Sequence, residues 1–304
     1  MNKRVVGLLS FLIVVLSLFL YQASALRING NGTAVAAAGA LATGDQQLSE
    51  LDPMAPTGLW VSNPIYAPKS FKNMGAHALR YDSQGHPHVV FGGDHLYYAY
   101  HDGAEWRVET VDDRGGVGQA ASLALDSADR PHIAYSVGST FDAVLNYVHW
   151  DGSQWNFHAS DSMKAETGVQ GMARIAVTSS GRPHILYGQY QDGDHSSLLH
   201  HIYWDGQEWQ TELVAEYGLY HALALDDNDT PHISYYGGEY GNPDVYYGHK
   251  ENGQWQFEYV ANGYPYQTDL VIDHQGRPHI AYYEDAFDTE LQHAYKDGDA
   301  WLPT

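Results

Sequence analysis

The chain has 304 residues, of which 44% are hydrophobic and 17% are charged, with no cysteine and a formal net charge of −22. The lack of cysteine excludes disulfide bonds as a source of stability, and the acidic balance argues against nucleic acid or an anionic lipid surface as a partner. A chain of this length can bury enough apolar surface to fold as one large domain or two smaller ones.

The N-terminus has the pattern of a secretory signal peptide. Lys3 and Arg4 precede an uncharged apolar run over residues 5–20, and the small residues 23–25 follow. We therefore expect residues 1–25 to be cleaved and the protein to be secreted and extracellular, with no membrane span after cleavage. The apolar run is shorter than the ~20 residues of a spanning helix. An N-terminus that stays in the membrane is the alternative.

Residues 26–57 are rich in Ala, Gly, Thr, Asn and Gln and show neither a strand nor a helix period, which predicts a flexible tether. Residues 58–304 repeat one motif, A-L-x-L-D-x-x-G-x-P-H-I-A-Y followed by L-x-Y-x-Y-x-D-G-x-x-W. Its Pro-His pair recurs at Pro87-His88, Pro131-His132, Pro183-His184, Pro231-His232 and Pro278-His279, and its tryptophan at Trp106, Trp155, Trp209, Trp255 and Trp301. Successive histidines are 44 to 52 residues apart, the size of a propeller blade.

Each repeat predicts four short strands. In the second repeat they cover residues 122–125, 131–135 and 145–149 and a segment that begins at Trp155. The first turn has Asp first and usually Gly fourth, which suits a type I turn, and Pro then opens the second strand. An Asp-Gly pair before the last strand favours a hairpin. Four antiparallel strands per repeat predict an all-β fold, a five-bladed β-propeller of four-stranded blades over residues 58–304.

The ends of the repeat region suggest how the ring closes. The last repeat stops at Thr304, three residues after Trp301, which leaves too little chain for a fourth strand. Residues 58–61 look like the start of such a strand. We therefore expect the segment around Trp60 to complete the last blade, so that no sheet edge is exposed. A chain that ends early at its C-terminus is the alternative.

The Asp-Gly-x-x-Trp turn resembles the Asp-box, S-x-D-x-G-x-x-W, of the sialidase-like (BNR-like) propellers that occur in secreted bacterial proteins. It lacks the leading Ser and the residue between Asp and Gly. The size and number of the repeats are similar to those of the five-bladed lectins of the tachylectin-2 type. Asp-boxes are structural turns in their families, so the resemblance implies a propeller and no catalytic residue.

The loops between the second and third strands, and between blades, vary in length and composition, whereas the other turns are nearly invariant. Variable loops on a repeated scaffold are where binding is usually placed. The candidate ligand-binding residues on them are Tyr217, Tyr220, His221, Tyr264, Tyr266, Gln267, Glu239, Tyr240, Asp94 and His95. Aromatic rings beside carboxylates and amides suit sugars, and they also suit protein partners. The tyrosine pairs before the fourth and fifth repeats favour the last two blades as the principal binding surface.

The histidine of the Pro-His pair holds the same place in every blade, so we expect each to make the same structural hydrogen bond, and we predict neither a metal site nor a cofactor. Glycoside hydrolysis needs a pair of carboxylates, and none stands out. Arg80 and Arg174 lie on first strands and could approach the central channel, where sialidases use three arginines.

The sequence therefore predicts a secreted, non-catalytic, lectin-like carbohydrate-binding module. We expect a monomer whose partner is a glycan or a cell-surface or extracellular protein. The alternatives are a glycoside hydrolase of the sialidase-like or arabinanase-like propeller type, and a protein-interaction or adhesion propeller.

Overall fold

The computed structural model describes residues 71–73, 77–115, 117–138, 143–165, 169–190, 197–239, 242–262, 267–283 and 290–303. The chain divides into residues 1–62 and residues 63–304, and every described residue belongs to the second unit. The predicted signal peptide, the tether and the segment around Trp60 lie outside the described residues. Within the described ranges, no helix has the length and apolar character needed to cross a membrane.

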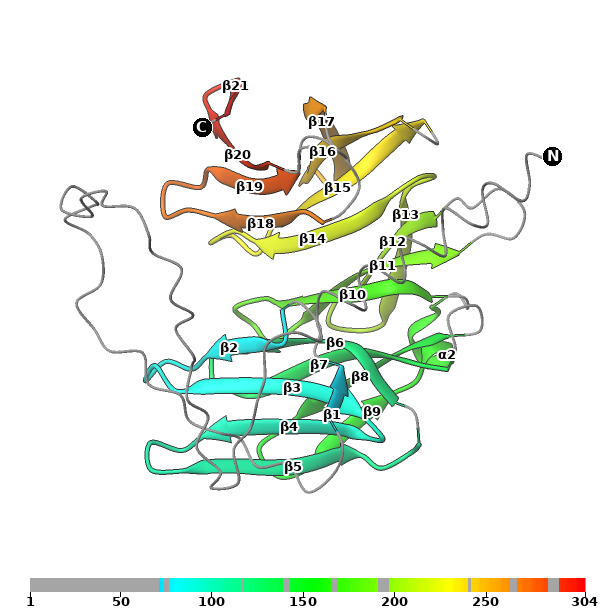
Figure 1. Cartoon of the computed structure of the whole chain (residues 1–304), viewed down its shortest axis with the longest axis vertical. Coiled ribbons are helices and arrows are strands. Elements are labelled where there is room, and N and C mark those ends of the chain that lie inside the picture. Colours follow the sequence, from blue (N-terminus) through cyan, green and yellow to red (C-terminus); the bar gives the residue numbers. More distant parts are fainter. Residues whose placement is uncertain are drawn as a thin grey trace, which may run out of the picture. The chain divides into compact units, whose positions relative to one another are not determined.

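The described strands form five antiparallel sheets, each made of consecutive strands (Figure 1). The first sheet contains β1 (Phe71–Asn73), β2 (Leu79–Tyr81), β3 (Pro87–Gly93), β4 (Leu96–His101) and β5 (Trp106–Asp112). The second contains β6 (Val117–Leu125), β7 (Pro131–Val137), β8 (Val144–Trp150) and β9 (Trp155–His158), and a short helix, α2 (Ser160–Met163), follows it. The third contains β10 (Val169–Val177), β11 (Pro183–Tyr190), β12 (Ser197–Trp204) and β13 (Trp209–Ala215). The fourth contains β14 (Leu219–Leu225), β15 (Pro231–Glu239), β16 (Asn242–Glu251) and β17 (Gln254–Asn262), and the fifth contains β18 (Asp269–Ile272), β19 (Pro278–Tyr283), β20 (Leu291–Asp297) and β21 (Ala300–Pro303).

The first strands of the five repeats, of which β1 is not one, surround one cavity. Strands β2, β6, β10, β14 and β18 all contribute to the lining of a space of about 590 Å³. Successive first strands contact each other from β2 to β18. His77 Nε2 lies 3.3 Å from Asp269 Oδ1 and links the first sheet to the fifth. These features confirm the predicted five-bladed β-propeller.

A side-chain oxygen at the first position holds the turn between the first two strands of each repeat: an aspartate in four repeats and Thr178 in the third. In the second repeat, Asp126 Oδ1 accepts hydrogen bonds from the backbone N–H groups of Ala128 and Arg130, each at 2.9 Å. The fourth residue of this turn has a positive φ, which glycine adopts without strain. That position is held by Gly85, Asp129, Gly181, Asp229 and Gly276. In the hairpin before the last strand, Asp151 Oδ1 accepts bonds from two further backbone N–H groups. Local chemistry thus explains why the motif repeats.

The repeated histidines make one repeated contact, as expected. The pairs are His88 with Tyr98, His132 with Tyr147 at 2.6 Å, His184 with His201 at 3.1 Å, His232 with Tyr247 at 2.5 Å and His279 with His293 at 3.0 Å. Each bond joins the second strand of a sheet to the third. The histidines therefore serve the packing of every blade.

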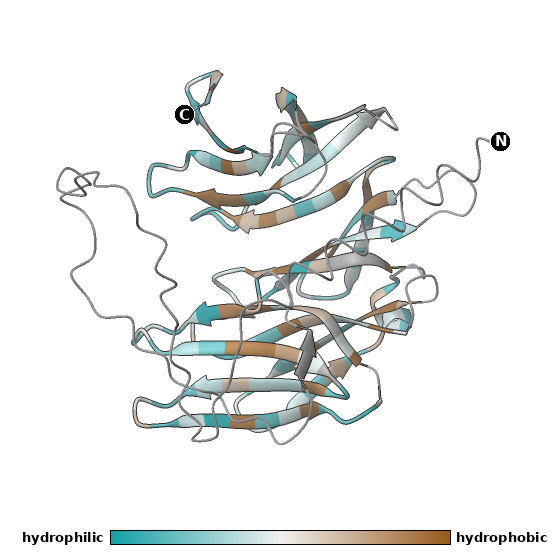
Figure 2. Cartoon of the chain, viewed as in Figure 1, coloured by the Kyte–Doolittle hydropathy of each residue, from teal (hydrophilic) through white to brown (hydrophobic). Residues whose placement is uncertain are grey.

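The hydrophobic core lies between neighbouring sheets. One cluster joins Val90 and Leu96 of the first sheet to Leu123 and Ile133 of the second. Similar clusters join the second sheet to the third, the third to the fourth and the fourth to the fifth. Figure 2 shows hydrophobic residues recurring along the strands and hydrophilic ones in the turns. Both faces of most sheets are therefore buried, as in stacked sheets generally.

The fifth sheet corrects one expectation. Its fourth strand, β21, pairs with β20 from Ala294↔Pro303 to Asp297↔Ala300, although the sequence suggested that too little chain remained for it. Four residues are enough, since β9 in the second sheet has the same length. The fifth blade thus does not depend on an N-terminal strand for its fourth strand. Whether residues 58–66 add to this sheet stays a prediction.

Candidate functional site

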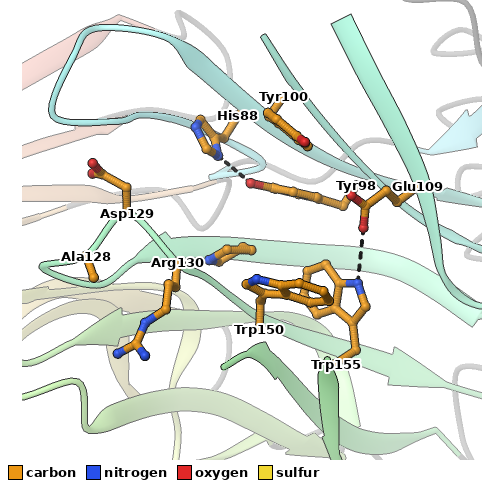
Figure 3. A pocket seen from close by; sticks show the side chains of 10 residues that line it. His88, Tyr98, Tyr100, Glu109, Ala128, Asp129, Arg130, Trp150 and Trp155 are labelled. Carbon is orange, nitrogen blue, oxygen red and sulfur yellow. Dashed lines mark hydrogen bonds between the residues drawn. The ribbon is translucent and has the colours of Figure 1, made fainter. Parts of the chain in front are cut away.

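A pocket of about 290 Å³ lies between the first and second sheets (Figure 3). The first sheet lines it with His88, Tyr98, Tyr100 and Glu109, and the second with Ala128, Asp129, Arg130, Pro131, Trp150 and Trp155. Residues 128–130 belong to the invariant turn between the first two strands of the blade. The pocket therefore lies on the side of the short turns, opposite the variable loops that the sequence analysis favoured.

The strands hold the aromatic walls of this pocket in place. Tyr98 and Tyr100 are two residues apart on β4, so they share one face of the strand, and their rings stack with centroids 5.6 Å apart. Trp150 and Trp155 are directly opposite each other on β8 and β9 and meet edge to face at 5.5 Å. Tyr98 also meets Trp155 edge to face, at 5.6 Å. These contacts fix four rings around one opening.

Several polar groups of the pocket are already engaged. Arg130 pairs with Asp126, with its Nη2 2.6 Å from Asp126 Oδ2. Asp129 accepts hydrogen bonds from the backbone N–H and hydroxyl of Ser83 in the neighbouring turn. His88 bonds to Tyr98, as Figure 3 shows, and burial lowers the pKa of His88. These groups therefore stabilise the walls.

Glu109 is the exception. Its Oε2 accepts a hydrogen bond of 3.3 Å from Trp155 Nε1, drawn in Figure 3, and within the described residues it has no ion pair. The pocket thus combines four aromatic rings with one carboxylate that can accept further hydrogen bonds. Such a surface can bind the apolar face of a sugar ring together with a hydroxyl or amino group.

The central cavity contains a second group of charges. Arg80 Nη2 lies 3.5 Å from His77 Nδ1, and both residues line the cavity with Asp269. Arg174 is 3% exposed, and its Nε and Nη1 have no hydrogen-bond partner among the described residues. Burial lowers the pKa of Arg174 to about 10, and the charge of Arg80 acts in the same direction, against the attraction of Asp269. Arg80 thus lines the channel as expected, and its positive charge disfavours the charged form of Arg174.

The predicted tyrosine surface is partly described. Tyr217 lies between β13 and β14, and Tyr220 lies in a bulge of β14 with a φ of 49° and 47% exposure. The backbone N–H of Thr268 donates to the carbonyl oxygen of Tyr220 at 3.1 Å, which brings the half-buried Gln267 near Tyr220. His221 is only 4% exposed and therefore offers little surface to a ligand.

The other predicted residues lie in different places. Glu239 ends β15. Asp94 and His95 form the turn between β3 and β4, where Tyr97 Oη donates to Asp94 Oδ1 at 2.9 Å and His95 Nδ1 lies 3.4 Å from the carbonyl oxygen of Arg114. Three predicted residues lie outside the described ranges: Tyr240, Tyr264 and Tyr266. Within those ranges, no three His, Asp or Glu side chains are arranged to hold a metal ion.

The sequence analysis did not predict the pocket between the first two sheets, although one position of the repeat differs there. Trp150 stands where the fourth and fifth repeats have Lys250 and Lys296. This position directly precedes the Asp-Gly pair of the hairpin turn, where the repeat motif specifies no residue. An alignment of the repeats at this position would have separated the second and third blades, which have Trp150 and Trp204, from the fourth and fifth.

No protein-family model matches the sequence, and no curated protein matches it in sequence. Solved structures match in fold. A protein of unknown function from Dyadobacter fermentans aligns over 76% of this chain and 84% of its own, with a TM-score of 0.52 and 10% identity. A polysaccharide lyase, an ulvan lyase bound to -[GlcA(1-4)Rha3S]-, aligns over 77% of this chain and 72% of its own, with a TM-score of 0.50 and 14% identity. The six-bladed propeller lectin of Aleuria aurantia, which recognises fucose, aligns over 77% and 80% with a TM-score of 0.48 and 14% identity. At these identities the likeness concerns the fold alone.

Proposed function

We propose that this protein is a carbohydrate-binding β-propeller and that it binds its ligand in the pocket between the first and second sheets. The observation that carries the proposal is the arrangement of Tyr98, Tyr100, Trp150 and Trp155 around the carboxylate of Glu109. Aromatic faces bind the C–H faces of sugars, and a carboxylate fixes their orientation by accepting hydrogen bonds. A polysaccharide lyase among the structures of similar fold is compatible with such a ligand.

The location of the protein is part of the same proposal. A signal peptide over residues 1–25 would deliver it outside the cell, where glycans and the surfaces of other cells are its available partners. Its formal charge of −22 favours neutral or cationic glycans over strongly anionic ones.

Binding of the purified protein to a glycan array tests the proposal. Trp150→Ala removes one wall of the pocket, and we expect retention of the bound glycan to fall at least about 30-fold, since aromatic residues at binding sites are often worth 2 kcal/mol or more. Trp204→Ala is the matched control, because Trp204 faces Trp209 in the third sheet as Trp150 faces Trp155 in the second. A loss in the control alone would move the site to another blade.

The predicted tyrosine surface is the second location, favoured by the exposure of Tyr220. Tyr220→Ala in the same array separates the two: if it abolishes retention and Trp150→Ala does not, the ligand binds at the variable loops. If no glycan is retained by the wild-type protein, the carbohydrate proposal fails and a protein partner takes its place.

A further inference from the structure

The grooves between neighbouring sheets repeat one hydrogen bond. A glutamate on the fourth strand of one sheet accepts a bond from the tryptophan indole N–H of the next. The bonds are Trp155 to Glu109 at 3.3 Å, Trp255 to Glu212 at 3.0 Å and Trp301 to Glu258 at 3.1 Å. The same carboxylate therefore stands at the same place in three grooves, and the environment of one can be compared with that of the others.

In two of these grooves a lysine neutralises the carboxylate. Lys250 Nζ lies 2.6 Å from Glu212 Oε1 and sits over two aromatic rings, 4.7 Å from the centroid of Tyr203 and 5.5 Å from that of Trp255. In the next groove, the ammonium group of Lys296 lies 2.5 Å from the carboxylate of Glu258. A lysine ammonium between a carboxylate and aromatic faces gains both an ion pair and cation–π attraction.

The groove between the first and second sheets has the same acceptors without the lysine. Trp150 pairs with Trp155 in the register in which Lys250 pairs with Trp255. Tyr100 pairs with His88 as Tyr203 pairs with His184, so the ring that lies under the lysine is also present. Arg130 does not replace the lysine, because its guanidinium is held by Asp126.

We propose that this pocket binds a primary ammonium group, which takes the place that lysine side chains hold in the other two grooves. The inference rests on the proposed function and names its ligand class: a glycan that contains amino sugars with free amino groups. The ammonium group donates to the carboxylate of Glu109 and faces the rings of Tyr100 and Trp155. The sugar ring to which it is attached packs against the remaining aromatic wall at Trp150.

Titration calorimetry on the full protein tests this with two matched probes, a β-1,4-linked glucosamine trisaccharide and its fully N-acetylated counterpart. Acetylation removes the charge and leaves the ring, so we expect the free amine to bind at one site and the acetylated probe to bind at least about tenfold more weakly. Equal affinity for the two probes would overturn the proposal.

Two variants localise the effect. Trp150→Lys places a lysine where the fourth and fifth sheets have one, and we expect it to abolish binding of the free amine while the melting temperature stays at or above that of the wild type. Glu109→Gln keeps an acceptor for Trp155 but removes the charge, and it should weaken binding of the free amine at least about tenfold. Undiminished binding by both variants would also overturn the proposal.

The failure of this inference is distinguishable from failure of the proposed function. If neither trisaccharide binds, but the array retains a neutral glycan and Trp150→Ala releases it, the ammonium ligand is wrong and the carbohydrate site stands. If Trp150→Ala changes nothing on the array, both are wrong. Lys250→Met is a positive control. It empties the cage that Glu212, Tyr203 and Trp255 form around the lysine ammonium, so the number of bound amines should rise from one to two. Failure to do so would contradict the comparison of grooves.

Discussion

His132 is one of the five repeated histidines and lies between a hydroxyl and a carboxylate. Its Nδ1 is 2.6 Å from Tyr147 Oη, and its Nε2 is 3.6 Å from Asp126 Oδ2. We expect His132→Ala to lower the free energy of unfolding by about 1 to 3 kcal/mol, because the buried hydroxyl of Tyr147 loses its partner. Denaturant unfolding measures this. Ligand binding should be unchanged at temperatures where the variant is folded.

The same variant reports the pH dependence of stability. Burial lowers the pKa of His132 to about 4, whereas an exposed histidine titrates near 6.5. Between these values the unfolded chain binds a proton that the folded protein does not, so the contribution of His132 is complete above pH 6.5 and is lost as the pH falls toward 4. The unfolding free energy of His132→Ala should therefore decline less steeply over this window. Parallel pH profiles for variant and wild type would contradict the assignment.

At the scale of elements, two pairs of turns are joined by the same side-chain contact. Asp129 accepts two hydrogen bonds from Ser83, and Asp229 accepts two from Ser179, each at 2.7 Å in the second pair. Both aspartates stand where other repeats have glycine and have a positive φ. Asp229→Gly therefore keeps the turn and removes only the contact between sheets.

We expect Asp229→Gly to lower the free energy of unfolding by about 0.5 to 1.5 kcal/mol, the net value of hydrogen bonds of this kind. Asp129→Gly should cost a similar amount, since the geometry is the same. Urea unfolding of Asp229→Gly, of Ser179→Ala and of the double variant measures the coupling free energy between the two side chains. Additive effects in the double variant would show that the contact does not stabilise the assembly of blades.

Strands and turns were predictable where the geometry of a turn requires a particular residue type. Asp126 is needed as an acceptor for backbone N–H groups, and Gly103 for a positive φ, so both recur at fixed spacing. The pocket was not predictable in the same way. It depends on Trp150 differing from Lys250 at a position that the repeat does not constrain, and on Glu109 from another sheet. Strand β21 was missed because the fourth strand was assumed to need more residues than it does.

At the scale of the whole molecule, the fifth sheet leaves apolar side chains exposed. Leu291 is 68% exposed and Val271 is 60% exposed, whereas Leu145 and Ala124, which hold the equivalent positions in the second sheet, belong to the core. A further strand from residues 58–66, which include Trp60, would cover such a surface. The sequence predicted that this segment closes the ring as the fourth strand of the fifth sheet. Because β21 is that strand, the segment would instead add a further strand that covers the apolar side chains.

Two deletions test closure. Removal of residues 58–66 should lower the melting temperature by several degrees, because the apolar surface of the fifth sheet would stay exposed to water. Removal of residues 26–50, from the predicted tether, should leave it nearly unchanged. Calorimetry of both against the wild type is the measurement. If the two deletions have equal and small effects, the segment does not close the ring.

The lysines that fill two of the grooves also determine how many ligands one molecule can hold. With Lys250 and Lys296 in place, the number of open cages is smaller than the number of blades, although all five blades share one architecture. A propeller with one open cage is monovalent: it cannot cross-link two cells, and it gains no avidity from a surface that displays its ligand many times. Exchange of one lysine per groove would change valency without changing the fold. Agglutination is therefore a property that such a scaffold can gain or lose through single residues.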